Sequence, residues 1–148
     1  MDERVARLKT PAECDEFAKN VTERGRPELA QQAIQRSIEL RAATYGAKSK
    51  AEQECLEAVY AYERILSAKN RRPTSASRTC QMIRRHGILK AAERAVNRDT
   101  PTIGYEALVN MGLQKFAFES VVLRYPELFS PECVQRSKQR MAEWKVSG

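Results

Sequence analysis

The sequence predicts an all-α protein, and two observations lead to this prediction. Apolar residues recur at helical spacing, for example Cys14, Phe17, Ala18 and Val21 at positions i, i+3, i+4 and i+7. No stretch shows the strict apolar–polar alternation, or the β-branched runs between turn pairs, that are typical of strands. We therefore expect a compact, multi-helix bundle.

The length of 148 residues is that of one domain, and it is sufficient for a hydrophobic core without disulfides or metal. We expect a single domain, residues 1–148, with seven to nine helices. Its parts are N-terminal helices in residues 10–68, a basic helix-turn-helix-like segment in 69–98 and C-terminal helices in 99–148. The pattern of residues 1–9 does not decide between a short helix and an arm.

Two capping boxes and several Gly and Pro residues set the helix ends of the first part. Thr10 with Glu13, and Ser49 with Glu52, are typical helix starts. The predicted helices cover residues 11–24, 27–43 and 50–68, with Gly25 between the first two.

The first two of these helices resemble the helical hairpin of the tetratricopeptide repeat family over about 34 residues. Gly25, Ala30, Ile34 and Ser37 fall at the turn and packing positions of that repeat. Ala42 stands where the repeat has its terminal Pro, and no second copy follows. The resemblance therefore implies local hairpin packing and not a peptide-binding solenoid.

Loops and short helices are expected after this hairpin and the helix that follows it. The stretch 70–77 contains Pro73 and has no apolar pattern, so it is predicted to be a loop. Further helices are predicted over residues 76–86, 88–97, 101–110, 113–124 and from 131 onwards. The helix 113–124 is apolar nearly all round, which is typical of a central helix.

The spacing of the cysteines and the lengths of the apolar runs indicate which compartment, metals and cofactors to expect. The four cysteines are 41, 25 and 53 residues apart, too far for a metal knuckle or a redox CxxC motif. The N-terminus has no apolar signal-peptide core, and no run approaches the length of a membrane span. We expect reduced thiols in a soluble cytoplasmic protein without cofactor, metal, membrane contact or an indicated small-molecule ligand.

The positive charge of the chain is local. Residues 69–98 contain nine Lys or Arg and one acid, Glu93, whereas the residues before them have a net charge of −1 and those after them 0. The whole formal charge of +7 thus comes from this stretch. A cluster of this kind is what a polyanion-binding surface needs, because binding releases the counterions of phosphates.

Helical spacing predicts that two short helices each have a basic outer face over an apolar inner one. On residues 76–86, Thr79 and Ile83 are expected inside and Arg78, Gln81 and Arg85 outside. The hydroxyls of Ser75, Ser77 and Thr79 are expected near a helix N-terminus, itself an anion site. The candidate nucleic-acid-binding residues are Arg71, Arg72, Arg78, Gln81, Arg84, Arg85, Lys90, Arg94 and Arg98.

Three interpretations of the basic stretch remain open at this point. It binds a nucleic acid, it docks an acidic protein partner, or it is a solvated face. The few aromatic residues disfavour base-stacking platforms and favour double-stranded DNA. The main alternative is a helical protein–protein interaction adaptor. DNA versus RNA, the target sequence and the oligomeric state are not predicted.

Catalysis is not indicated. His86, the only histidine, lies six residues from Cys80, so a Cys–His dyad within one helix is not expected. Phosphate-binding Gly-rich motifs and clustered metal-binding carboxylates are also absent from the sequence. The sequence therefore predicts a binding protein and not an enzyme.

Overall fold

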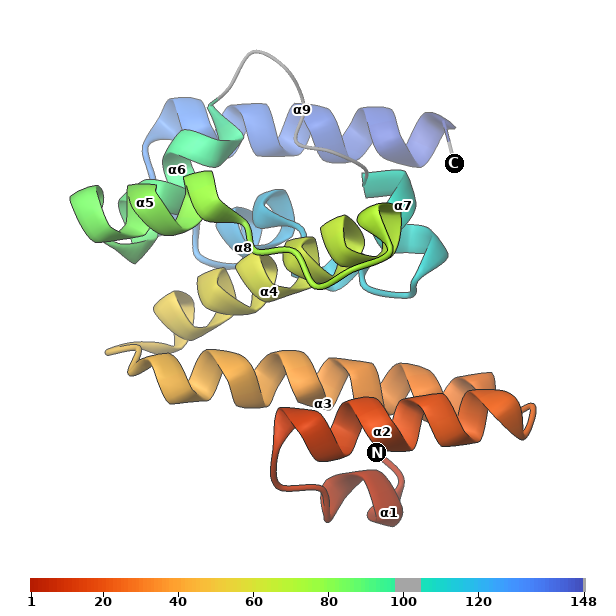
Figure 1. Ribbon diagram of the computed structural model, residues 1–148. Helices are drawn as coiled ribbons and strands as arrows, with labels where there is room; N and C mark the ends of the chain where they lie inside the picture. Colours follow the sequence, from red (N-terminus) through yellow and green to blue (C-terminus); the bar gives the residue numbers. More distant parts are fainter. Residues whose placement is uncertain (98–104, 148) are drawn as a thin grey trace. The chain divides into compact units, whose positions relative to one another are not determined.

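The computed structural model describes residues 1–97 and 105–147, and its described secondary structure is entirely helical (Figure 1). Nine α-helices and two 3-10 helices lie in this part of the chain, which confirms the predicted all-α class. Contacts divide the chain into two compact units, Met1–Ala47 and Lys48–Gly148. The division lies just before the second capping box, so the helix that begins there belongs with the basic stretch and not with the N-terminal hairpin.

Unit 1 consists of α1 (Glu3–Ala6), α2 (Pro11–Glu23) and α3 (Pro27–Tyr45). The start of α2 is the predicted capping box: Thr10 Oγ1 accepts a hydrogen bond from Glu13 N at 3.1 Å. The Glu13 carboxylate accepts one from Lys9 N at 2.9 Å. Gly25, at φ +75°, forms the turn between α2 and α3, a conformation that glycine adopts without strain.

Small residues let α2 and α3 pack closely, as the tetratricopeptide resemblance implies. Ala18, Ala30 and Ala33 are buried together with Val21 and Leu29. Residues 1–9, for which the sequence pattern allowed a short helix or an arm, contain the short helix α1. Its residue Val5 is buried in the same core.

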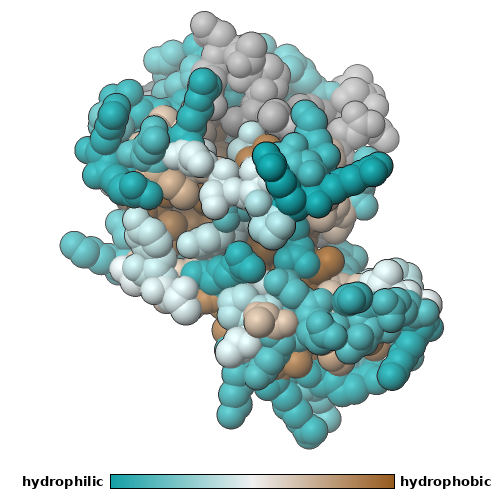
Figure 2. Space-filling view, in the orientation of Figure 1, coloured by the Kyte–Doolittle hydropathy of each residue, from teal (hydrophilic) through white to brown (hydrophobic). Residues whose placement is uncertain are grey.

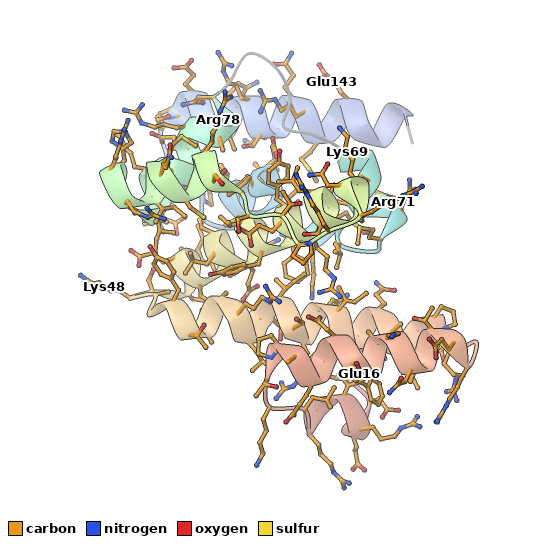
Figure 3. All side chains as sticks on the ribbon, viewed as in Figure 1. Glu16, Lys48, Lys69, Arg71, Arg78 and Glu143 are labelled. Carbon is orange, nitrogen blue, oxygen red and sulfur yellow. The ribbon has the colours of Figure 1, made fainter. Side chains whose placement is uncertain are left out.

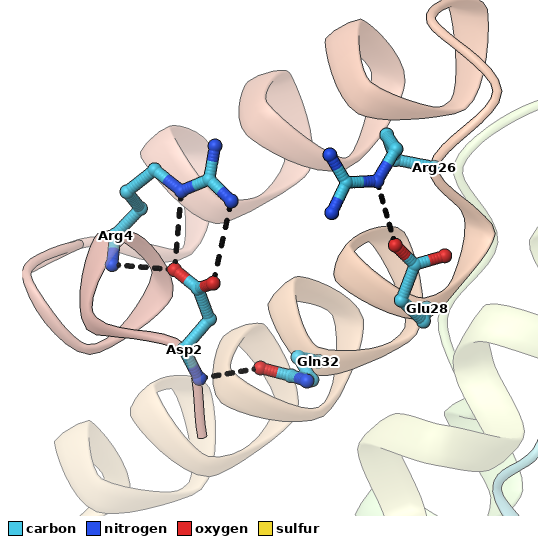
Figure 4. Close-up of polar contacts among 5 residues, drawn as sticks. All are labelled: Asp2, Arg4, Arg26, Glu28 and Gln32. Atoms are coloured by element: carbon cyan, nitrogen blue, oxygen red, sulfur yellow. Dashed lines mark hydrogen bonds and ion pairs between the residues drawn. The ribbon is translucent and has the colours of Figure 1, made fainter.

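Polar contacts at the edge of unit 1 fix the N-terminus (Figure 4). Asp2 N donates to Gln32 Oε1 at 2.7 Å, which ties the start of α1 to α3. The Asp2 carboxylate also accepts from Arg4 Nε at 3.2 Å, and this hydrogen bond lowers the pKa of Asp2. Arg26 and Glu28 form an exposed ion pair at 2.7 Å.

Unit 2 is built around two short central helices. Helix α6 contacts α4, α5, α8 and α9, and α8 contacts α4, α6 and α9. The unit contains α4 (Lys50–Asn70), α5 (Ser77–His86), α6 (Ile88–Val96), α7 (Tyr105–Asn110), η1 (Gln114–Phe116), α8 (Phe118–Arg124), η2 (Pro126–Leu128) and α9 (Pro131–Ser147). The first residues of the predicted helix 101–110, residues 101–104, lie outside the described residues.

The prediction of one continuous helix over residues 113–124 is wrong in its first half. The chain forms η1, an extended residue at Ala117 (φ −63°, ψ 143°) and then α8. A continuous helix would turn Phe116 and Phe118 about 200° apart, so that both could not face the same core. The break at Ala117 allows both rings to be buried, with exposures of 3% and 7%. The expectation of a central helix holds for α8, where Val121 and Val122 are fully buried.

A buried ion pair joins the centre of unit 2. Arg140 Nη1, on α9, donates to Glu119 Oε2 on α8 at 3.1 Å and also to the carbonyl oxygen of Val96 on α6. The two side chains are 10% and 1% exposed. One turn earlier on α9, Arg136 Nη1 donates to the carbonyl oxygen of Asn97 at 3.0 Å. Two arginines thus bind carbonyls at the C-terminal end of α6, where the helix dipole favours cations.

The cysteines of both units are free thiols, and three of them are buried. Burial raises the pKa of the Cys55 and Cys133 thiols to about 12, so these groups are protonated at neutral pH. Within the described part of the chain, none of the helices combines the length and the apolar character that crossing a membrane requires.

We predict that Arg140→Met destabilises the protein by about 3–5 kcal/mol, because it leaves the Glu119 carboxylate buried without its partner. The double variant Glu119→Leu/Arg140→Met is expected to recover most of this loss, since it removes both charges. Urea unfolding followed by circular dichroism measures both values. A cost below about 1 kcal/mol for the single variant would contradict a role for this ion pair in holding α6, α8 and α9 together.

Candidate nucleic-acid interface

Helix α5 is held at both ends and along one side. The residue that precedes it, Ala76, is its N-cap and donates its N–H to Glu63 Oε2 on α4 at 2.8 Å. Thr79 and Ile83 form its buried side, with exposures of 8% and 7%. The burial of Thr79 agrees with the inner position that helical spacing predicted, but it leaves the Thr79 hydroxyl unavailable as a donor at the surface. The Glu63 carboxylate thus lies close to the N-terminal end of α5.

Helix α6 follows after a turn at Gly87, whose φ of +89° lies in the region that favours glycine. Its inner side is formed by Ala91, Ala92, Ala95 and Val96, all at most 2% exposed. Lys90 and Arg94 are exposed on the other side. Asn97, just after the helix, is half-buried, and its Oδ1 is a buried atom without a hydrogen bond.

The predicted binding residues that the structure describes are all exposed. They form two groups, which Figure 3 shows through its labels: Lys69 and Arg71 lie at the C-terminal end of α4, and Arg78 lies apart from them on α5. We call the second group the α5–α6 surface; it consists of Arg78, Gln81, Arg84, Arg85, Lys90 and Arg94. Arg98 lies outside the described residues.

The separation of the two groups follows from the loop that connects α4 and α5. From Arg71 onwards the chain runs back beside α4 before α5 begins (Figure 1). Hydrogen bonds of Ser67 with Thr74 fix this course, with Thr74 N donating to Ser67 Oγ at 2.8 Å. Arg71 and Arg72 are therefore sequence neighbours of the α5–α6 surface but not part of it.

Among the described residues, no carboxylate pairs with a cation of the α5–α6 surface. The acids of unit 2 bind other groups. Glu54 forms an ion pair with Arg124 at 2.6 Å and accepts a hydrogen bond from Tyr125. Glu93, the acid within the basic stretch, accepts from Ser130 N at 2.7 Å at the start of α9.

The net positive charge of the chain lies entirely in unit 2. Residues 1–47 contain eight Lys or Arg and eight Asp or Glu, so unit 1 has no net charge and the formal +7 belongs to residues 48–148. Figure 2 shows strongly hydrophilic side chains gathered over the part of unit 2 where α5 lies. Counting only residues that the structure describes, the α5–α6 surface thus carries positive charge without a carboxylate partner.

Three of the basic residues lie where the backbone conformation or the helix dipole disfavours a basic side chain. Arg71 ends α4 in the left-handed conformation, at φ +56°, where glycine is usual. Arg78 lies in the first turn of α5 and Lys90 in the first turn of α6. The helix dipole disfavours cations there by about 0.3–1 kcal/mol. Local helix stability therefore does not explain a basic side chain at these three positions.

A shallow hollow of about 430 Å³ adjoins the Gly87 turn. Ile88, Leu89 and Leu128 provide its apolar lining, and its polar lining contains both acidic and basic groups: Glu52, His86, Lys90 and Glu93. In the part of the chain that the structure describes, no group of three or more His, Cys, Asp or Glu side chains is placed to hold a metal ion.

Sequence reasoning missed the residues that support this surface. Glu63, Glu93, Arg136 and Arg140 each bind a backbone group at the end of another helix. In the sequence they have the spacing of ordinary solvent-facing residues. Only the proximity of helices far apart in the chain distinguishes them.

No protein-family model, curated protein or solved structure matches this chain.

We predict that Arg71→Gly stabilises the protein by about 1 kcal/mol, because it removes the cost of a left-handed conformation for a side chain with a Cβ. Arg71→Ala removes the same charge but keeps the Cβ, so it is the matched control and is expected not to stabilise. Thermal unfolding of the two variants measures the difference. Equal stability of the glycine and alanine variants would show that Arg71 is not strained.

Proposed function

We propose that this protein is a non-enzymatic nucleic-acid-binding protein that binds double-stranded DNA in the cytoplasm through the α5–α6 surface. One observation carries the proposal: five exposed cations on two adjacent helices have no carboxylate partner among the described residues. The five are Arg78, Arg84, Arg85, Lys90 and Arg94.

Phosphate binding is the interaction that such a surface favours. Cations that are not neutralised within the protein displace the counterions of a polyanion, and the release of those ions drives association. Arginine adds geometric specificity, because its guanidinium group binds two phosphate oxygens at once. Among the side chains of unit 2 whose exposure the structure describes, the large hydrophobic ones at least 44% exposed are Val109 and Leu128, neither of them aromatic. Binding through phosphates fits this surface better than stacking of single-stranded bases.

Local helix stability is the simplest competing explanation of the charges. It accounts for Arg84 and Arg85, which lie in the last turn of α5, where the helix dipole favours cations. It does not account for Arg78 and Lys90, which lie in first turns. Binding of an external anion explains both pairs, and this favours the proposal over a merely solvated face.

We predict that Arg84→Glu/Arg85→Glu weakens binding to a 20-base-pair duplex on the order of 100-fold at low salt, because two phosphate contacts become repulsive. The control is Lys19→Glu/Arg24→Glu, which makes the same charge change near the C-terminal end of α2 in unit 1, where both side chains are exposed. This control is expected to keep most of the affinity. Gel shifts measure binding, and circular dichroism verifies that both variants stay helical.

Two outcomes would contradict the proposal. The first is the absence of duplex binding by the unmodified protein at low salt. The second is an equal loss in both double variants, which would show that only the net charge matters. Nuclease-resistant capture of one acidic protein through the same arginines would instead support an adaptor that docks an acidic partner.

A further inference from the structure

The two helices of the α5–α6 surface differ in how accessible they are. Helix α6 is in contact with four other helices, and its exposed side is limited to the region of Lys90 and Arg94. Helix α5 packs mainly on α6 and lies at the outer edge of unit 2 (Figure 1). A groove of a nucleic acid can therefore receive α5 but not α6.

The outer side of α5 carries a stripe of three long polar side chains. At 100° per residue, Arg78, Gln81 and Arg85 fall within an arc of about 60°, directly opposite the buried Ile83. All three are exposed. With a rise of 1.5 Å per residue the stripe is about 10 Å long, which equals about three base-pair steps of 3.4 Å.

The side chains of the stripe are those that recognise base edges. Arginine forms paired hydrogen bonds with guanine, and glutamine does so with adenine, and both patterns occur in the major groove of DNA. That groove is about 12 Å wide and admits an α-helix. The deep, narrow major groove of an RNA duplex does not admit one, so this geometry selects DNA.

We infer that α5 enters the major groove of DNA and that Arg78, Gln81 and Arg85 read about three consecutive base pairs, while Lys90 and Arg94 of α6 contact flanking phosphates. This inference rests on the proposed function and adds sequence selectivity to it. It also differs from the usual helix-turn-helix arrangement, in which the second helix of the pair enters the groove.

The attachment of α5 suits it to this role. Its N-terminal end is fixed by the hydrogen bond of Ala76 to Glu63, and its C-terminal end by the Gly87 turn onto α6. A helix that is held at both ends loses little conformational freedom on binding, and side chains on a rigid element are placed accurately for base readout.

Selection of bound duplexes from a library with eight randomised base pairs tests the inference. The expected result for the unmodified protein is a preferred core of three or four base pairs that contains guanine and adenine. In Gln81→Ala, discrimination in favour of adenine at one position is expected to fall by about 5- to 150-fold. Arg84→Ala is the matched control: Arg84 is exposed but lies about 90° from the centre of the stripe, so the substitution should lower affinity for all sequences alike.

The outcomes separate this inference from the proposed function. If the protein binds duplexes without any sequence preference, α5 does not recognise bases, but the proposed DNA binding is unaffected. A preference that Gln81→Ala does not change, or that Arg84→Ala changes equally, would also overturn it. If the protein binds no duplex at low salt, both the proposed function and this inference fail.

Discussion

The contact of Arg140 with Glu119 and the carbonyl oxygen of Val96 is the interaction on which unit 2 depends. It joins α9, α8 and the end of α6 in one buried site. A buried charge is tolerated only when it is paired and its hydrogen-bonding capacity is used, and here the cation binds both a carboxylate and a helix terminus. The position of α6 is therefore fixed by specific polar geometry in addition to the packing of its alanines.

A fixed α6 provides the platform on which α5 lies. The alanines on its inner side allow neighbouring helices to approach closely, and Gly87 sets the direction in which the chain leaves α5. Several carboxylates of unit 2 bind groups within the unit, at helix ends and in ion pairs with Arg124, Arg136 and Arg140. These same contacts stabilise the fold, and among the described residues none of them neutralises a cation of the α5–α6 surface.

The features that the sequence predicted depend on local interactions. The capping boxes at Thr10 and Ser49 predicted the first residues of α2 and α4 to within one residue. Helical spacing predicted which side of α5 is buried and which is exposed. The break at Ala117 was not predictable in this way, because it depends on the burial of two rings against partners distant in the chain. The separation of Arg71 from Arg78 was missed for a related reason: charge along a sequence does not reveal the course of a loop. The partners of Glu93 and Arg140 required the tertiary arrangement.

The salt dependence of duplex binding tests most directly whether the cations of the α5–α6 surface contact phosphates. Each phosphate contact contributes about 0.9 to the slope of log affinity against log salt concentration, so five cations give a slope of about 4 to 5 in magnitude. Titration of a short duplex at several salt concentrations measures this slope. A magnitude below about 1 would contradict the account, because the surface would then bind no more than a single phosphate.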